Sequence, residues 1–224
     1  MLPNFFNDLF TAALFLLIWQ GYEWRARRLR SVNSLSGLMD QMRTQWMRTM
    51  LKRSPRIMDA QLQSALLTGV GFFASTTIVA IGGLLAMIGN IERLSEVLEG
   101  MGLHSGIPWT YKLVAIAMVF VYAFFQFAWA YRLFNYLVIM MGAQPDPIDA
   151  DKLDLTANRL GRMHAVAALH FSSGLRAFYF AIALISWLAG DVALIVVTLM
   201  ITLLLYWRDD KTPFLVVLRE FDHE

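Results

Sequence analysis

Long apolar runs, separated by charged stretches, constrain the fold of this 224-residue chain more than any other feature. Hydrophobic residues make up 58% of the sequence, against roughly 45–50% in a typical soluble domain. Lipid offers no hydrogen-bond partner to the backbone, so a run that crosses a membrane does so as a helix. The short alternating segments of a membrane β-barrel are not evident. The sequence therefore predicts an all-α integral membrane protein, built as one membrane domain over residues 1–224.

The apolar runs fit a bundle of five transmembrane helices. We expect the spans at about residues 5–24, 60–91, 111–135, 165–189 and 192–207. The last two come from one stretch, Ala177–Trp207, of 31 residues with a single charge at Asp191. One helix of that length would measure about 46 Å, whereas a hydrocarbon core is about 30 Å thick. A hairpin at Gly190-Asp191 is favoured because Gly ends helices and Asp starts them; one tilted helix, giving four spans, is the alternative.

The first loop, residues 25–60, holds nine Lys and Arg residues and only two Asp residues. Short loops rich in Lys and Arg stay on the cytoplasmic side of a membrane. We therefore expect the N-terminus outside and, with a fifth span, the C-terminus in the cytoplasm. The expected location is the bacterial inner membrane. The chain has no cysteine, which excludes disulfides, thiolate metal sites and cysteine nucleophiles.

Residues 35–53 of this loop predict an amphipathic helix. Apolar Met and Trp side chains recur there at helical spacing, and the basic residues fall largely off that stripe. A helix of this kind lies in the plane of the lipid headgroups. We also expect transmembrane helices of the bundle to extend beyond the membrane into the cytoplasm. The residues expected to contact lipid headgroups are Arg43, Arg48, Lys52, Arg53 and Trp46. The alternative is that the basic residues only set the orientation of the chain.

Polar side chains within predicted spans are candidates for a functional site. This set comprises Gln126, Arg132 and Asn135 in the third span, and His170 and Arg176 in the fourth. One interpretation is a polar pocket open to the cytoplasm, in which Arg176 binds an anionic group such as a lipid phosphate. The other is structural, with Arg176 snorkelling to the interface and pairing with Asn135, Gln126 or a carboxylate. Because an unpaired charge in apolar surroundings is costly, we expect Arg176 to be paired.

The second span is rich in small residues, which let helix backbones approach closely. The expected packing positions are Gly71, Ser75, Gly82, Gly83 and Ala86, and they favour a central place for this helix. No metal site or cofactor is predicted. His164 and His170 are six residues apart, whereas a metal-binding His pair on one helix needs a spacing of three or four. Nucleic acid is not an expected partner in this membrane setting.

Several stretches together resemble one family of membrane proteins. They are Phe72–Thr77 and Ile81–Ala86 in the second span, Val121–Phe127 with Trp129-Ala130 in the third, His170-Phe171 and Gly174–Ala181 in the fourth, and Trp46-Met47 and Arg56–Asp59 in the first loop. The family is catalogued as domain-of-unknown-function family 599 and occurs in bacteria and plants. The resemblance covers nearly the whole chain. It implies a multi-pass membrane protein and brings no activity, substrate or catalytic residue.

Three classes of function fit these observations. We rank first a structural or accessory membrane protein that acts through helix–helix and lipid contacts, since this needs no catalytic residue. A homo-oligomeric transporter or channel with a cytoplasm-facing polar pocket comes second. A membrane enzyme acting on lipids comes third, because it would need clustered acid and base groups. The expected partners are membrane lipids and either further copies of the chain or other membrane proteins.

Overall fold

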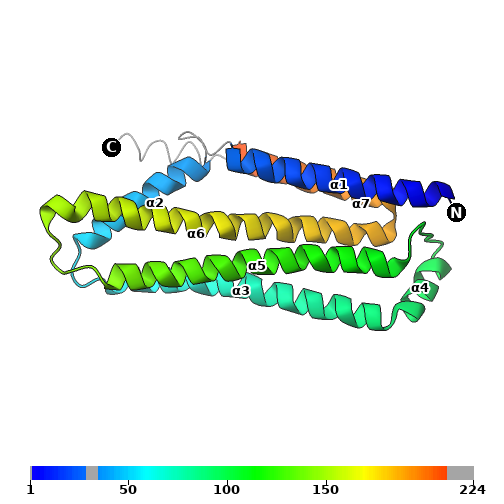
Figure 1. The fold of residues 1–224 in the computed structure, drawn as a ribbon, viewed down its shortest axis with the longest axis horizontal. Helices are drawn as coiled ribbons and strands as arrows, with labels where there is room; N and C mark the ends of the chain where they lie inside the picture. The colour runs from blue at the N-terminus through cyan, green and yellow to red at the C-terminus, as the bar shows by residue number, and fades with distance from the viewer. Residues whose placement is uncertain (1, 29–34, 211–224) are drawn as a thin grey trace.

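The computed structural model describes residues 2–28 and 35–210, and every regular element in these ranges is a helix (Figure 1). The elements are α1 (Leu2–Arg28), α2 (Leu35–Leu51), α3 (Ile57–Gly89), α4 (Ile91–Gly100), α5 (Trp109–Gly142), α6 (Ala150–Ile185), the 3₁₀ turn η1 (Ser186–Ala189) and α7 (Asp191–Asp210). Four of these segments are long and apolar enough to cross a membrane, namely α3, α5, α6 with η1, and α7. The all-helical membrane class predicted from the sequence is therefore confirmed.

The long helices run along one direction, with α6 and α5 packed together in the middle (Figure 1). Helices α1 and α7 lie side by side and flank one part of α6, while α2 packs on the part that they leave uncovered. Helix α3 packs along α5 at the opposite edge. The core between α5 and α6 combines large rings with alanines: Phe127 and Phe180 are fully buried, as are Ala123, Ala130 and Ala177. Gly174 permits this close contact, because a Cβ there would lie 2.7 Å from the Phe127 ring.

The predicted helical hairpin at Gly190-Asp191 is present. Helix α6 ends at Ile185, η1 continues to Ala189, and α7 begins at Asp191. Gly190 has a φ of 125°, a region that residues with a Cβ rarely adopt. The chain therefore reverses at the one residue type that permits it, and α6 and α7 become separate helices.

The central place predicted for the second span is wrong. Helix α3 contacts mainly α5, and only 11% of its most apolar stretch is buried. Ser75, Gly82, Gly83 and Ala86 are exposed, and Gly71 is half-buried. Small side chains allow a close approach but do not determine which neighbour makes it. The part of the chain that the structure describes provides no such neighbour on this face of α3.

Helix α2 packs against α6 rather than standing alone. Met47, Met50 and Leu51 are buried, so part of the predicted Met stripe faces protein. The contact is close at Gly161 of α6, where a Cβ would lie 2.8 Å from the Cα of Thr44. The amphipathic helix is thus present over Leu35–Leu51, and its place in the headgroup plane stays a prediction.

Candidate functional site

A buried ion pair joins α1 to α6. Arg176 Nε donates to Glu23 Oε2 at 2.6 Å, and its Nη2 donates to Oε1 at 3.1 Å. Ser173 Oγ and Arg27 Nε donate to Glu23 Oε1, at 2.7 and 2.9 Å. The Glu23 and Arg176 side chains are less than a tenth exposed. The carboxylate therefore accepts four donors, which offsets the cost of burying it.

A second buried ion pair joins α1 to α5. Lys112 Nζ lies 2.8 Å from Asp8 Oδ1, and both side chains are nearly inaccessible. The other oxygen, Asp8 Oδ2, accepts the backbone N–H groups of Gly106 and Ile107 at 2.7 and 3.1 Å. The indole Nε1 of Trp187 completes the cluster, and it also reaches Asp191 at 2.9 Å. Asp8 therefore ties α1 to α5, to the loop before α5 and to η1.

These two ion pairs lie about 22 Å apart along α1, since 15 residues at 1.5 Å each separate Asp8 from Glu23. Between them, the rings of Phe15, Trp19 and Tyr22 surround Phe180 of α6. A cavity of about 460 Å³ remains between α1, α5 and the end of α6. The two ion pairs anchor α1, because its carboxylates pair with Lys112 on α5 and Arg176 on α6. Its charged groups are already paired, which suits positioning of α1 better than acid–base chemistry.

The predicted pairing of Arg176 is confirmed, and its partner is a carboxylate. The other residues proposed for the polar pocket lie in separate contacts. Gln126 and His170 hydrogen-bond at 2.8 Å. Arg132 is exposed, donates to the Tyr136 hydroxyl at 2.6 Å and lies over the Trp129 ring. Asn135 is half-buried, and within the described residues only Gln126 and His170 of this set bond to each other.

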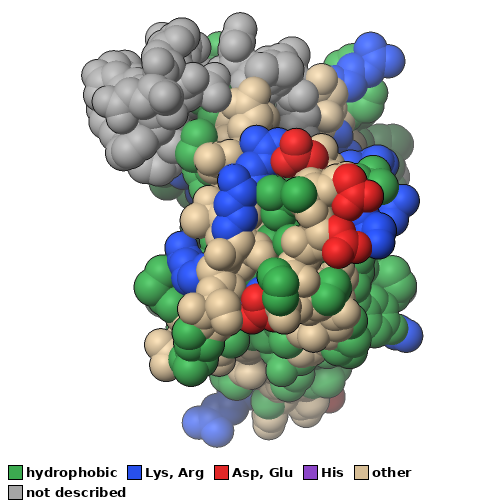
Figure 2. Space-filling view, turned by 90° about the vertical axis from the view of Figure 1, so that its left-hand side faces the viewer, with side chains coloured by type: hydrophobic (Ala, Val, Ile, Leu, Met, Phe, Trp, Pro, Cys, Tyr) green, Lys and Arg blue, Asp and Glu red, His purple; other side chains and the backbone are tan. Residues whose placement is uncertain are grey.

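The residues predicted to meet lipid headgroups lie at one end of the molecule, around α2 and the α5–α6 connection. Figure 2 shows Lys and Arg side chains over this end, with Asp and Glu among them. Four of the five have partners within the chain: Arg43 pairs with Asp40, Arg48 with Asp154, and both Arg53 and Trp46 bind Asp59. Lys52 is exposed. Headgroup contact by this set stays a prediction.

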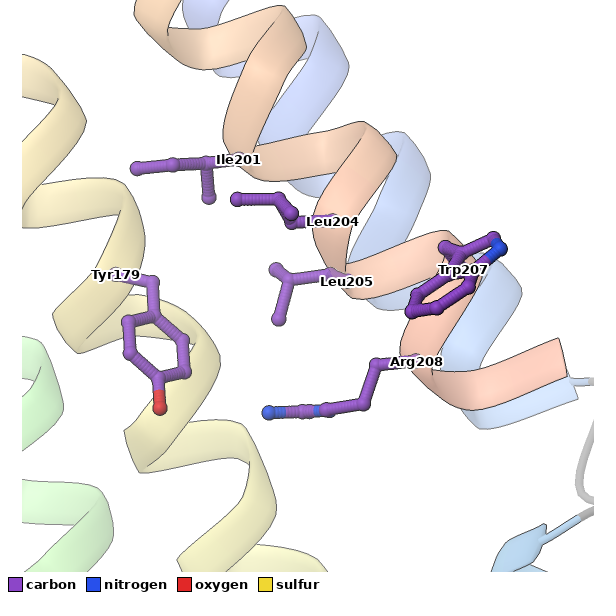
Figure 3. Close-up of a pocket in the computed structure, with 6 residues that line it drawn as sticks. All are labelled: Tyr179, Ile201, Leu204, Leu205, Trp207 and Arg208. Atoms are coloured by element: carbon purple, nitrogen blue, oxygen red, sulfur yellow. The ribbon is translucent and has the colours of Figure 1, made fainter. Parts of the chain in front are cut away.

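A further cavity of about 380 Å³ lies between α6 and α7. Its lining is mostly apolar, with Ile201, Leu204 and Leu205 from α7. Figure 3 shows the Tyr179 hydroxyl and the Arg208 side chain at one end of it and Ile201 at the other.

Sequence reasoning missed Asp8, Glu23 and Lys112. Each lies near an end of an apolar run, where charged residues are common and carry no signal of burial. One signal was present, since an Arg expected inside the membrane needs a carboxylate, and Glu23 is a carboxylate at the edge of a span.

Comparison with known proteins identifies the family of this chain but assigns no activity to it. No curated protein and no solved structure matches the chain. The model of one protein family, described as "Protein of unknown function, DUF599", matches residues 10–213. The match includes Lys112 and Arg176, the cations of the two buried ion pairs, and most of every long helix. The chain therefore belongs to the DUF599 family.

Proposed function

We propose that this protein is a non-enzymatic accessory protein of the membrane. It acts by helix–helix contact through the outer face of α3, and its partner there is a second copy of the chain. The observation that carries the proposal is the composition of that face. Gly71, Ser75, Gly82, Ala86 and Gly89 follow one another at spacings of four, seven, four and three residues. Such spacings place them on one side of a helix.

This side points away from α5. The buried residues of α3 form a different stripe, which includes Val70, Thr77 and Leu84. At Gly71, Gly82 and Gly89, an added Cβ would meet no atom of another described element within 4 Å. Glycine inside a helix is less stable than alanine by roughly 0.5–1 kcal/mol. Among the described residues these glycines bring no packing in return, whereas a second helix could pack closely against them.

The absence of cysteine makes the proposal directly testable, because a single introduced thiol is the only one in the chain. Ala86→Cys places it on the small-residue side of α3. Leu203→Cys is the matched control, since Leu203 is 67% exposed on α7. In native membranes, oxidation should link Ala86→Cys into a dimer and leave Leu203→Cys monomeric. Equal linking of both variants, or none of either, would overturn the proposal.

The finer topology belongs to the same proposal. We infer that α1 is the fifth span, because its two ion pairs hold it against α5 and α6 over about 22 Å. Its N-terminal end then lies outside, and the end of α7 lies in the cytoplasm with α2 and the basic residues. The bacterial inner membrane is the proposed location, with Lys52 free to meet anionic headgroups.

A further inference from the structure

A cavity of about 400 Å³ opens at the basic end of the molecule, between the start of α3 and the end of α5. This volume lies within the roughly 300–1,000 Å³ of small-molecule sites. Its walls include apolar Met50, Val138 and Met141, and its polar lining includes Arg56, Gln63 and Asp146. None of these six residues takes part in the two ion pairs that anchor α1, and none lies on the outer face of α3.

Gln63 is fully buried beside this cavity, yet neither its Oε1 nor its Nε2 has a hydrogen-bond partner among the described residues. Leaving a buried amide unpaired is costly, and buried polar groups are nearly always bonded. An amide is both a donor and an acceptor. The unpaired amide therefore indicates a ligand that offers a donor and an acceptor close together.

Arg56 is held in place by two hydrogen bonds, which leave its Nε–H among the unused donors. Its Nη1 donates to the carbonyl of Gln144 at 3.0 Å and its Nη2 to the carbonyl of Pro145 at 2.8 Å. Its Nε is buried without a hydrogen-bond partner. Two carbonyls do not neutralise a guanidinium, and no carboxylate of the described residues forms an ion pair with Arg56. The cavity thus contains a fixed cation that lacks an anion.

Asp146 supplies the opposite charge at the exposed side of the cavity. Its Oδ2 accepts from Ser54 Oγ at 2.7 Å, and no ion pair joins it to a described Lys or Arg. The ligand therefore meets a cation, an anion and a neutral amide that donates and accepts. An ion of a single charge would satisfy one of the two charges and leave the other unpaired.

We propose that this cavity binds a small zwitterion, which carries an anionic group and a primary ammonium. The anionic group bonds to Arg56, the ammonium to Asp146, and the Gln63 amide to both. Two sources have this chemistry, a free α-amino acid and the phosphoethanolamine headgroup of a lipid. The site is independent of the contact proposed for α3, so either proposal can fail alone.

The test uses the purified full chain in detergent and measures the melting temperature as each probe is added, since a bound ligand stabilises the folded state. The probes are the free α-amino acids and glycerophosphoethanolamine. Each has a matched control in which the ammonium is trimethylated and cannot donate a hydrogen bond. A saturable rise with at least one zwitterion, absent with its trimethylated form, is expected. The responding probe distinguishes the free amino acid from the headgroup.

Three variants assign the effect to this cavity. Gln63→Leu and Asp146→Asn should each weaken binding of the responding probe by about tenfold or more, as loss of a hydrogen-bonded contact would. Gln61→Leu is the control, because Gln61 is exposed two residues earlier on α3. Asp146 is also exposed, so its variant reports on binding even if Gln63→Leu alters folding. The proposal is overturned if no zwitterion raises the melting temperature, or if binding survives in both cavity variants.

Discussion

The guanidinium of Arg176 and the carboxylate of Glu23, 153 residues apart in the sequence, meet at 2.6 Å with both side chains largely buried. They come from α6 and α1, and they form a buried ion pair between these helices. This ion pair matters for the stability of the fold because breaking it is costly. Removing one member leaves a buried charge without a partner, and losses of about 3–5 kcal/mol are typical for such changes.

Glu23→Gln should therefore lower the free energy of unfolding by about 3–5 kcal/mol, seen as a lower melting temperature in detergent. Replacing both members by leucine should recover most of that loss, because well-packed apolar residues often substitute for a buried pair. Glu96→Gln on α4 is the control, since Glu96 is exposed, and it should change stability by less than about 0.5 kcal/mol. A Glu23→Gln variant as stable as this control would show that the pair contributes nothing.

The contact between α2 and α6 depends on the missing side chain of Gly161. A Cβ there would clash with Thr44 Oγ1 and lie 2.8 Å from the Thr44 Cα. The hydroxyl can rotate away, but the Cα belongs to the backbone of a packed helix. Gly161→Ala should thus destabilise the protein by about 1–3 kcal/mol, as overpacking does, and limited proteolysis should cut within α2 more readily.

Gly69→Ala is the matched substitution, since a Cβ at Gly69 meets nothing within 4 Å. It should be neutral or stabilise by roughly 0.5–1 kcal/mol, because alanine loses less entropy in a helix. If Gly161→Ala behaves like Gly69→Ala, α2 does not pack on α6 as described.

Local features of the fold could be predicted from the sequence, whereas its pairings could not. The hairpin at Gly190-Asp191 followed from the length of one apolar stretch and from two adjacent residues. The need of Arg176 for a partner followed from the cost of a buried charge. That the partner is Glu23 depends on which helices become neighbours, and a single sequence with no internal repeat does not contain that information. The same limit misplaced α3, because its small residues indicate a close contact without naming the helix that makes it.

The buried amide of Gln63 leads to a prediction about the protein without ligand. Gln63→Leu removes two unpaired polar atoms from the interior and keeps a similar volume. It should raise the free energy of unfolding by about 1–3 kcal/mol, the cost of leaving such a group unsatisfied, and the melting temperature should rise accordingly. Gln61→Leu, at an exposed position, should leave it nearly unchanged. A fall in stability for Gln63→Leu would mean that the amide has a partner in the folded protein.

The two ion pairs of α1 predict that this helix crosses the membrane, although α1 is not among the four segments that are long and apolar enough to do so by composition alone. Asn7→Cys near its start and Lys52→Cys after its end should therefore face opposite sides, and both positions are exposed. With the basic loop inside, a membrane-impermeant maleimide should label Asn7→Cys on intact cells and Lys52→Cys only after permeabilisation. Glu96→Cys, on α4 just beyond the far end of α3, should label like Asn7→Cys. If Asn7→Cys and Lys52→Cys label together, α1 lies on one side of the membrane, and its ion pairs hold it there without a crossing.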